Sequence, residues 1–124
     1  MKRLRILVVD DQPEIVRVLQ LALTRHDVVR AGCAVEAIEA LSEGQFDVVV
    51  SDGDMPGMHG VTLLSRIAAT YPDVHRVLFT GQTPADLWSL RSGGVIDAFI
   101  AKPDFAGVIH VCDYLAATSP CSTA

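Results

Sequence analysis

Five short apolar runs alternate along the chain with five segments that have the spacing of amphipathic helices. The first run, Leu4–Val9, is continuously apolar, which is typical of a parallel strand that is buried on both faces. Strands that alternate with helices form right-handed βαβ units, and such units build a parallel sheet with helices on both faces. The alternation therefore predicts one α/β domain around a five-stranded parallel sheet.

The bounds of the predicted elements follow from the places where the apolar period changes. The strands are predicted at Leu4–Val9, Val28–Ala31, Phe46–Val50, Val77–Phe79 and Ile96–Ala101. The helices are predicted at Pro13–Leu23, Val35–Leu41, Val61–Ala68, Pro84–Arg91 and Ala106–Ala117. Residues 1–118 are assigned to the single domain, and residues 119–124 to a disordered tail or the start of a linker.

Charge and composition exclude several classes of protein. Ten basic residues against 15 acidic ones give a net charge of −5 without a basic patch, which argues against direct nucleic-acid binding. No run approaches the ~20 apolar residues of a membrane span, and no signal peptide is visible. Cys33, Cys112 and Cys121 contain no CxxC pair, so free thiols in a reducing compartment are expected. We therefore expect a cytoplasmic protein that does not associate with membranes.

Polar side chains follow four of the five predicted strands. Asp10 and Asp11 follow the first strand, Asp52 and Asp54 the third, Thr80 the fourth and Lys102 the fifth. The second strand ends in an alanine and a glycine, which is consistent with a place at the edge of the sheet. In open α/β sheets the ligand site lies beyond the carboxyl ends of the strands, so these side chains are expected to converge there.

A group of carboxylates at one place restricts the chemistry of the site. Two carboxylates near 4 Å repel by about 4 kcal/mol at an effective dielectric of about 20, so the group must take up protons, cations or a metal. Carboxylate oxygens with room for water suit Mg²⁺. With the positive charge of Lys102 and the hydroxyl of Thr80, they predict a site for a phosphoryl group held by metal, lysine and hydroxyl.

These motifs, in this order, make the chain similar to the receiver domains of two-component response regulators, including the chemotaxis type, over about residues 4–117. The matching elements are Asp10-Asp11, the loop from Asp52 to Gly60, Thr80-Gly81 and the segment from Phe99 to Pro103. The resemblance implies a flavodoxin-like (βα)5 fold with strand order 2-1-3-4-5. It also implies a cis Lys102–Pro103 peptide bond.

The resemblance also implies the role of each acidic residue. Asp52 is the phosphoacceptor, which takes a phosphoryl group from a phosphohistidine on a histidine kinase or phosphotransfer protein. Mg²⁺ is held by Asp10, Asp11 and Asp52 together with the backbone carbonyl of Asp54. The domain is then no enzyme in the usual sense, because it catalyses only its own phosphorylation and dephosphorylation.

Three further residues are implied to turn phosphorylation into a change of surface. Lys102 pairs with the phosphoryl oxygens, Thr80 hydrogen-bonds one of them, and Phe99 turns inward as Thr80 moves. The surface that responds comprises the fourth helix, the fifth strand and the last helix, where Trp88 either packs or is exposed. The output partner is not identified, and phosphorylation-linked homodimerisation stays open.

Three residues depart from the pattern of the family. Gly53 stands where receivers usually carry an aliphatic residue, and Phe99 lacks the hydroxyl that tyrosine has at the switch position. Asp54 adds a carboxylate two residues after the acceptor, so we hypothesise that it alters the lifetime of the phosphorylated state.

Three alternatives compete with the receiver interpretation. A haloacid-dehalogenase-type phosphohydrolase also pairs two acids as Asp52 and Asp54 are paired, but it does so after its first strand. A pseudo-receiver would keep the fold and bind partners without phosphorylation. A flavin-binding module would need a phosphate loop where Asp10-Asp11 stand.

Overall fold

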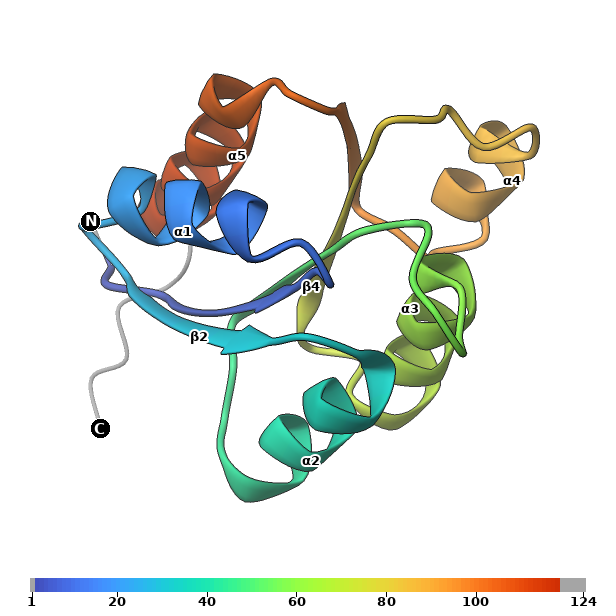
Figure 1. Cartoon of the computed structure of the whole chain (residues 1–124), viewed down its shortest axis with the longest axis horizontal. Helices are drawn as coiled ribbons and strands as arrows, with labels where there is room; N and C mark the ends of the chain where they lie inside the picture. Colours follow the sequence, from blue (N-terminus) through green and yellow to red (C-terminus); the bar gives the residue numbers. More distant parts are fainter. Residues whose placement is uncertain (1, 119–124) are drawn as a thin grey trace.

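The computed structural model describes residues 2–118, in which five parallel strands alternate with five helices (Figure 1). The strands are β1 (Arg5–Val9), β2 (Asp27–Ala31), β3 (Val48–Ser51), β4 (His75–Thr80) and β5 (Ala98–Ala101). They form one sheet in the order β2-β1-β3-β4-β5, with every neighbouring pair parallel. The predicted fold class, strand order and edge position of β2 are confirmed.

The helices cover both faces of this sheet. They are α1 (Pro13–Ala22), α2 (Ala34–Glu43), α3 (Gly60–Thr70), α4 (Leu87–Ser92) and α5 (Phe105–Thr118). Figure 1 shows α1 and α5 together on one face, and α2 and α3 on the other. Because both faces are covered, the central strand β3 buries all of its residues, which explains its continuous apolar run.

Alternate residues of each strand enter two separate cores. Ile6 and Val8 of β1 pack with the apolar faces of α1 and α5. Leu7 and Val9 of the same strand face the opposite side and pack with α2, α3 and Leu90 of α4. Successive side chains of a strand point to opposite faces, so one short run supplies both cores.

Six predicted bounds are wrong by two or three residues. β4 begins at His75 rather than Val77, and α2 and α3 end at Glu43 and Thr70 rather than at Leu41 and Ala68. The other three are starts that were predicted too early. β3 begins at Val48 rather than Phe46, because the carboxylate of Asp47 accepts a hydrogen bond from the backbone N–H of Arg5 and ends the loop there. The fifth strand begins at Ala98 rather than Ile96, since the turn after α4 and the irregular segment that follows it occupy residues 93–97. α4 begins at Leu87 rather than Pro84, because a turn closed by the hydrogen bond from Leu87 N–H to the Pro84 carbonyl precedes it.

The thiols of the described residues match the sequence-based expectation. Cys33 and Cys112 are free, and burial raises the pKa of the Cys112 thiol to about 12. Cys121 and the predicted tail at 119–124 lie outside the described residues. Between residues 2 and 118, none of the helices has the length and apolar content that crossing a bilayer requires.

Candidate functional site

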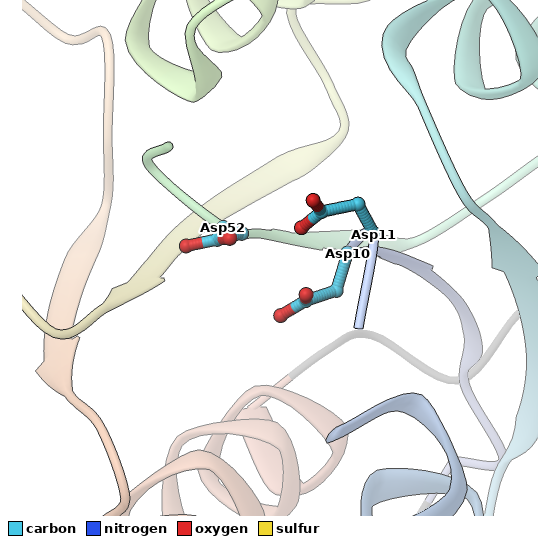
Figure 2. Close-up of side chains that lie close together, drawn as sticks. All are labelled: Asp10, Asp11 and Asp52. Carbon is cyan, nitrogen blue, oxygen red and sulfur yellow. The ribbon is translucent and has the colours of Figure 1, made fainter. Parts of the chain in front are cut away.

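Three carboxylates gather beyond the carboxyl ends of β1 and β3 (Figure 2). Asp10 and Asp11 directly follow β1, and Asp52 directly follows β3. The neighbouring strands hold the backbone at both places: Asp10 N–H donates to the Ala31 carbonyl at 3.1 Å, and Asp52 N–H to the Val9 carbonyl at 2.8 Å. One carboxylate oxygen from each of the three residues lies within 4.8 Å of the others.

Lys102 brings a positive charge into this group from the far edge of the sheet. It follows β5, and its backbone N–H donates to the Thr80 carbonyl at 2.9 Å, which extends the pairing of β5 with β4 by one residue. Its Nζ lies 2.9 Å from Asp10 Oδ2 and 3.3 Å from Asp52 Oδ1. The peptide bond between Lys102 and Pro103 is cis, as the resemblance implied.

Burial makes the negative charges of the site expensive. The exposed fraction is 4% for Asp10 and 7% for Asp52, whereas Asp11 is exposed. Burial raises the pKa of Asp10, and the charge of Asp52 adds to this effect. The hydrogen bonds from Lys102 and from Gln12 N–H oppose the rise. One lysine against three carboxylates leaves an excess of negative charge that a cation would neutralise.

The donor set fits a hard divalent cation. Ligand oxygens on one Mg²⁺ lie up to about 4.2 Å apart, twice the bond length of about 2.1 Å. The observed span of 4.8 Å is close to this value, and the exposed side chain of Asp11 has room to close the difference. The three carboxylates can therefore share one ion after a small rotation of a side chain.

Thr80 and Gly53 meet at the border of this cluster. Thr80 ends β4 with an exposed fraction of 5%, and its Oγ1 lies 3.5 Å from the backbone N of Gln82. Asp54 is exposed and belongs to the loop that leads to α3. Residues of this loop and of the loop after β4 line a groove of about 480 Å³, including Gly53, Asp54, His59, Thr80, Gln82 and Pro84.

Phe99 and Trp88 lie on the side of the molecule formed by β5 and α4. Phe99 is paired in register with Leu78 of β4, and its half-buried ring packs against the same core as Leu90 of α4. Trp88 is 83% exposed, so it does not pack into the core and stands on the outer face of α4. The two aromatic side chains therefore occupy the inner and the outer side of this region.

Sequence reasoning missed three residues that organise the molecule. Gly60 begins α3, and a Cβ there would overlap the backbone carbonyl of Asp52, so only glycine lets the helix approach the strand this closely. His26 is buried and bridges Leu4 N–H and Asp113. Arg76 is buried within β4, whereas the strand predicted from the sequence begins one residue later at Val77, so the charge was not recognised as part of a strand.

Comparison with known proteins gives one family. The family model of the response regulator receiver domain matches residues 6–110 of this chain. The C4-dicarboxylate transport transcriptional regulatory protein DctD of Rhizobium meliloti is 33% identical over 102 residues, which cover 79% of this chain. The chain spans only 22% of the length of that relative.

Two solved structures are similar over nearly the whole chain. The signal receiver domain of an HD domain-containing protein from Pseudomonas fluorescens has a TM-score of 0.84 at 32% identity, with 94% of this chain and 95% of that one covered. The response regulator TrrA from Thermotoga maritima, in complex with Mg²⁺ and BeF, has a TM-score of 0.79 at 29% identity. The coverage in that case is 93% of this chain and 99% of the other.

Proposed function

Because the chain belongs to the response regulator receiver domain family, we propose that it is a phosphoacceptor switch of a two-component signalling system. Asp52 takes the phosphoryl group from a histidine kinase or a phosphotransfer protein. The observation that carries the proposal is the position of Lys102 Nζ, which lies between Asp10 and Asp52 at 2.9 and 3.3 Å. A positive charge at this position supports Asp52 as the acceptor, because it would face the charge of the incoming phosphoryl group.

We propose that the metal ion in this reaction is Mg²⁺. It would be held by the side chains of Asp10, Asp11 and Asp52 and by the backbone carbonyl of Asp54. The bound ion supplies positive charge to the phosphoryl oxygens and lowers the repulsion between the carboxylates. The 4.8 Å span of the three carboxylate oxygens supports this assignment, as does the complex of the similar protein TrrA with Mg²⁺ and BeF.

In the proposed reaction, a carboxylate oxygen of Asp52 forms a bond to phosphorus. The bond between phosphorus and the histidine nitrogen breaks, and its electron pair stays on the imidazole. Lys102 then faces the phosphoryl oxygens and stabilises their charge, while the hydroxyl of Thr80 donates a hydrogen bond to one of them. The reaction changes the protein itself and turns over no external substrate.

The phosphorylated state acts through the surface of α4, β5 and α5. Thr80 moves toward the phosphoryl group, and Phe99 fills the space that it leaves, which biases a two-state surface. Trp88 on α4 and Tyr114 on α5 are 83% and 63% exposed, so large aromatic side chains are available for a partner. The partner is an output protein, an output domain or a second phosphorylated copy, in the cytoplasm.

Intact mass after incubation with acetyl phosphate tests the proposal. With Mg²⁺ present, we expect the mass to rise by one phosphoryl group, and no rise for Asp52→Asn or without the metal. Asp73→Asn, at an exposed position near the opposite ends of the strands, is the matched control and should be phosphorylated like the wild type. No gain of mass under any condition would contradict the proposal and leave a pseudo-receiver.

A second proposal concerns the exposed carboxylate of Asp54. It lies in the loop beside the acceptor, and we propose that it alters the lifetime of the phosphorylated state, by repulsion or by binding a metal-coordinated water. The rate of dephosphorylation of Asp54→Asn should differ from that of the wild type, whereas that of Asp73→Asn should not. Equal rates for all three proteins would exclude a role of Asp54.

A further inference from the structure

Gly53 stands directly against the side chain of Thr80. A Cβ built at position 53 would lie 3.0 Å from Thr80 Oγ1, 3.1 Å from its Cβ and 3.3 Å from its Cγ2. These are the three nearest heavy atoms, so the space for a side chain at 53 is limited by Thr80.

The backbone does not require glycine at this position. Gly57, four residues later, has φ of 89°, which side chains rarely adopt, whereas Gly53 is not among the residues with positive φ. Gly60 is also different, because its Cβ would meet backbone rather than a side chain. At Gly53, therefore, a side chain is opposed by a residue that is able to move.

A groove borders the side chain of Thr80. The groove of about 480 Å³ extends from Gly53 and Thr80 along the loop after β4. The hydroxyl of Thr80 is held only by a long contact of 3.5 Å with the backbone N–H of Gln82. Its observed position is thus stabilised mainly by packing. Because residue 53 has no side chain, nothing at that position clashes with Thr80.

We propose that Gly53 is a positioning residue that stabilises the resting position of Thr80. The proposal rests on the proposed function, in which Thr80 leaves this position to bond the phosphoryl group on Asp52. In the proposed switch, Thr80 leaves its contact with position 53 as it moves toward the Asp52 carboxylate. A methyl group at 53 penalises the resting position and leaves the phosphoryl-bound position unaffected.

Affinity for a phosphoryl analogue measures this balance, because a ligand that binds one state gains apparent affinity as that state becomes populated. Binding of beryllofluoride in the presence of Mg²⁺ is followed by ¹⁹F NMR for the wild type and for Gly53→Ala. We expect Gly53→Ala to bind with a Kd lower by about fivefold or more, since the apparent Kd varies inversely with the competent fraction. Gly44→Ala, at the opposite end of the sheet, is the control, because its Cβ meets only the flexible tip of Arg5.

A double-mutant cycle separates action through Thr80 from a general effect on the loop. In a Thr80→Ala background the methyl group at 53 loses the contacts with Oγ1 and Cγ2 and keeps only the one with Cβ at 3.1 Å, so Gly53→Ala should change the Kd much less than it does in the wild type. Thr80→Ser is a second background, which keeps the hydroxyl and should give an intermediate effect. Thermal unfolding of each variant verifies that it is folded under the conditions of the titration.

Each outcome decides the proposal. Tighter binding of Gly53→Ala that becomes much smaller in the Thr80→Ala background supports it. An unchanged or higher Kd for Gly53→Ala overturns it, and so does an equal effect in all backgrounds. If the wild type itself binds no beryllofluoride with Mg²⁺, the proposed function fails, and this inference fails with it. The titration of the wild type alone therefore tells a failure of the proposed function from a failure of the inference about Gly53.

Discussion

The two ends of the sheet treat charged side chains in opposite ways. At the carboxyl ends of the strands, three carboxylates crowd around one lysine, and two of them are buried. At the amino ends, the charged groups are matched by partners on neighbouring loops. Both ends belong to the same sheet and are covered by the same helices, so the fold itself does not require this difference in charge.

Arg76 is the main example at the amino end. Its guanidinium donates to the backbone carbonyls of Pro72, Val74, Gly94 and Val95 at 2.6 to 3.4 Å. It thereby joins the loop before β4 to the turn after α4. In addition, its backbone N–H donates to Asp97 Oδ2 at 2.7 Å.

Two other polar groups close loops at the same end. His26 Nδ1 accepts a hydrogen bond from Leu4 N–H at 3.1 Å, so the ring proton lies on Nε2, which faces Asp113 Oδ1 at 3.1 Å. Asp47 accepts from Arg5 N–H and pairs with Lys2 at 3.0 Å. Each of these side chains satisfies a backbone or charged group that would otherwise lack a partner.

The comparison teaches that unmatched charge, and not a hollow in the surface, marks the functional end. A depression of about 870 Å³ lies at the amino end, where Phe46, Tyr71 and Val74 are among its lining residues. Among residues 2–118, the group of acidic side chains close enough to share a metal ion lies at the other end of the sheet. Proteins depart from local consistency at functional sites and make up for the cost elsewhere. The amino end should therefore determine stability, and the carboxyl end should reduce it.

Arg76→Ala gives the largest effect that we expect. It leaves the buried carbonyl of Val74 and three part-buried carbonyls without their donors, which should lower the free energy of unfolding by about 3 kcal/mol or more. Urea unfolding measures this change. Arg91→Ala, at an exposed position of α4, is the control, with an expected change within about 0.5 kcal/mol. A similar small change for Arg76→Ala would contradict the role of the amino end.

His26→Ala should lower the free energy of unfolding by about 2 kcal/mol, because Leu4 N–H then lies buried without an acceptor. His26→Asn is the matched variant. Its amide oxygen occupies the place of Nδ1, so it keeps the bond to Leu4, loses the bond to Asp113 and should cost about half as much. Affinity for Mg²⁺ should stay as in the wild type for both variants. A changed affinity would show that the two ends are coupled.

Asp10→Asn should have the opposite sign and stabilise the metal-free protein by about 1 kcal/mol, because it removes one of the repelling buried charges. The amide oxygen still accepts the hydrogen bond from Gln12 N–H. The same variant should lose affinity for Mg²⁺ in a calorimetric titration. If Asp10→Asn is less stable than the wild type without metal, the crowding of carboxylates is not a cost to the fold.

The smallest effect that we expect is a dependence of the free energy of unfolding on pH, caused by Asp10. The pKa of Asp10 is raised in the folded protein, so the folded state binds a proton more readily than the unfolded state does. Stability from this group is lost as the pH rises through the raised pKa, and it returns as the pH falls toward the ordinary value. In mildly acidic buffer, the free energy of unfolding of the metal-free wild type, measured with urea, should therefore rise relative to that of Asp10→Asn. Parallel pH profiles would contradict the prediction.

The sequence alone was sufficient for the fold and for most of the site. The alternation of apolar runs and helical periods predicted the sheet and both helical layers, because a strand covered on both faces cannot carry polar residues in its interior. The positions of Asp10, Asp52 and Lys102 directly after strands predicted their convergence, since all parallel strands end at one edge. The bounds of α4 were less predictable, because that helix is short and only Leu90 in it is fully buried.

What the tertiary structure alone decided lies in contacts between residues far apart along the chain. The partners of Arg76 and His26 come from separate loops, and neither leaves a periodic trace in the sequence. Gly53 was recognised as a departure from the family, but its contact with Thr80 depends on how closely β3 and β4 approach each other at their ends. Periodicity records which face of an element is buried, whereas a distance of 3 Å between two side chains is set only when the elements pack.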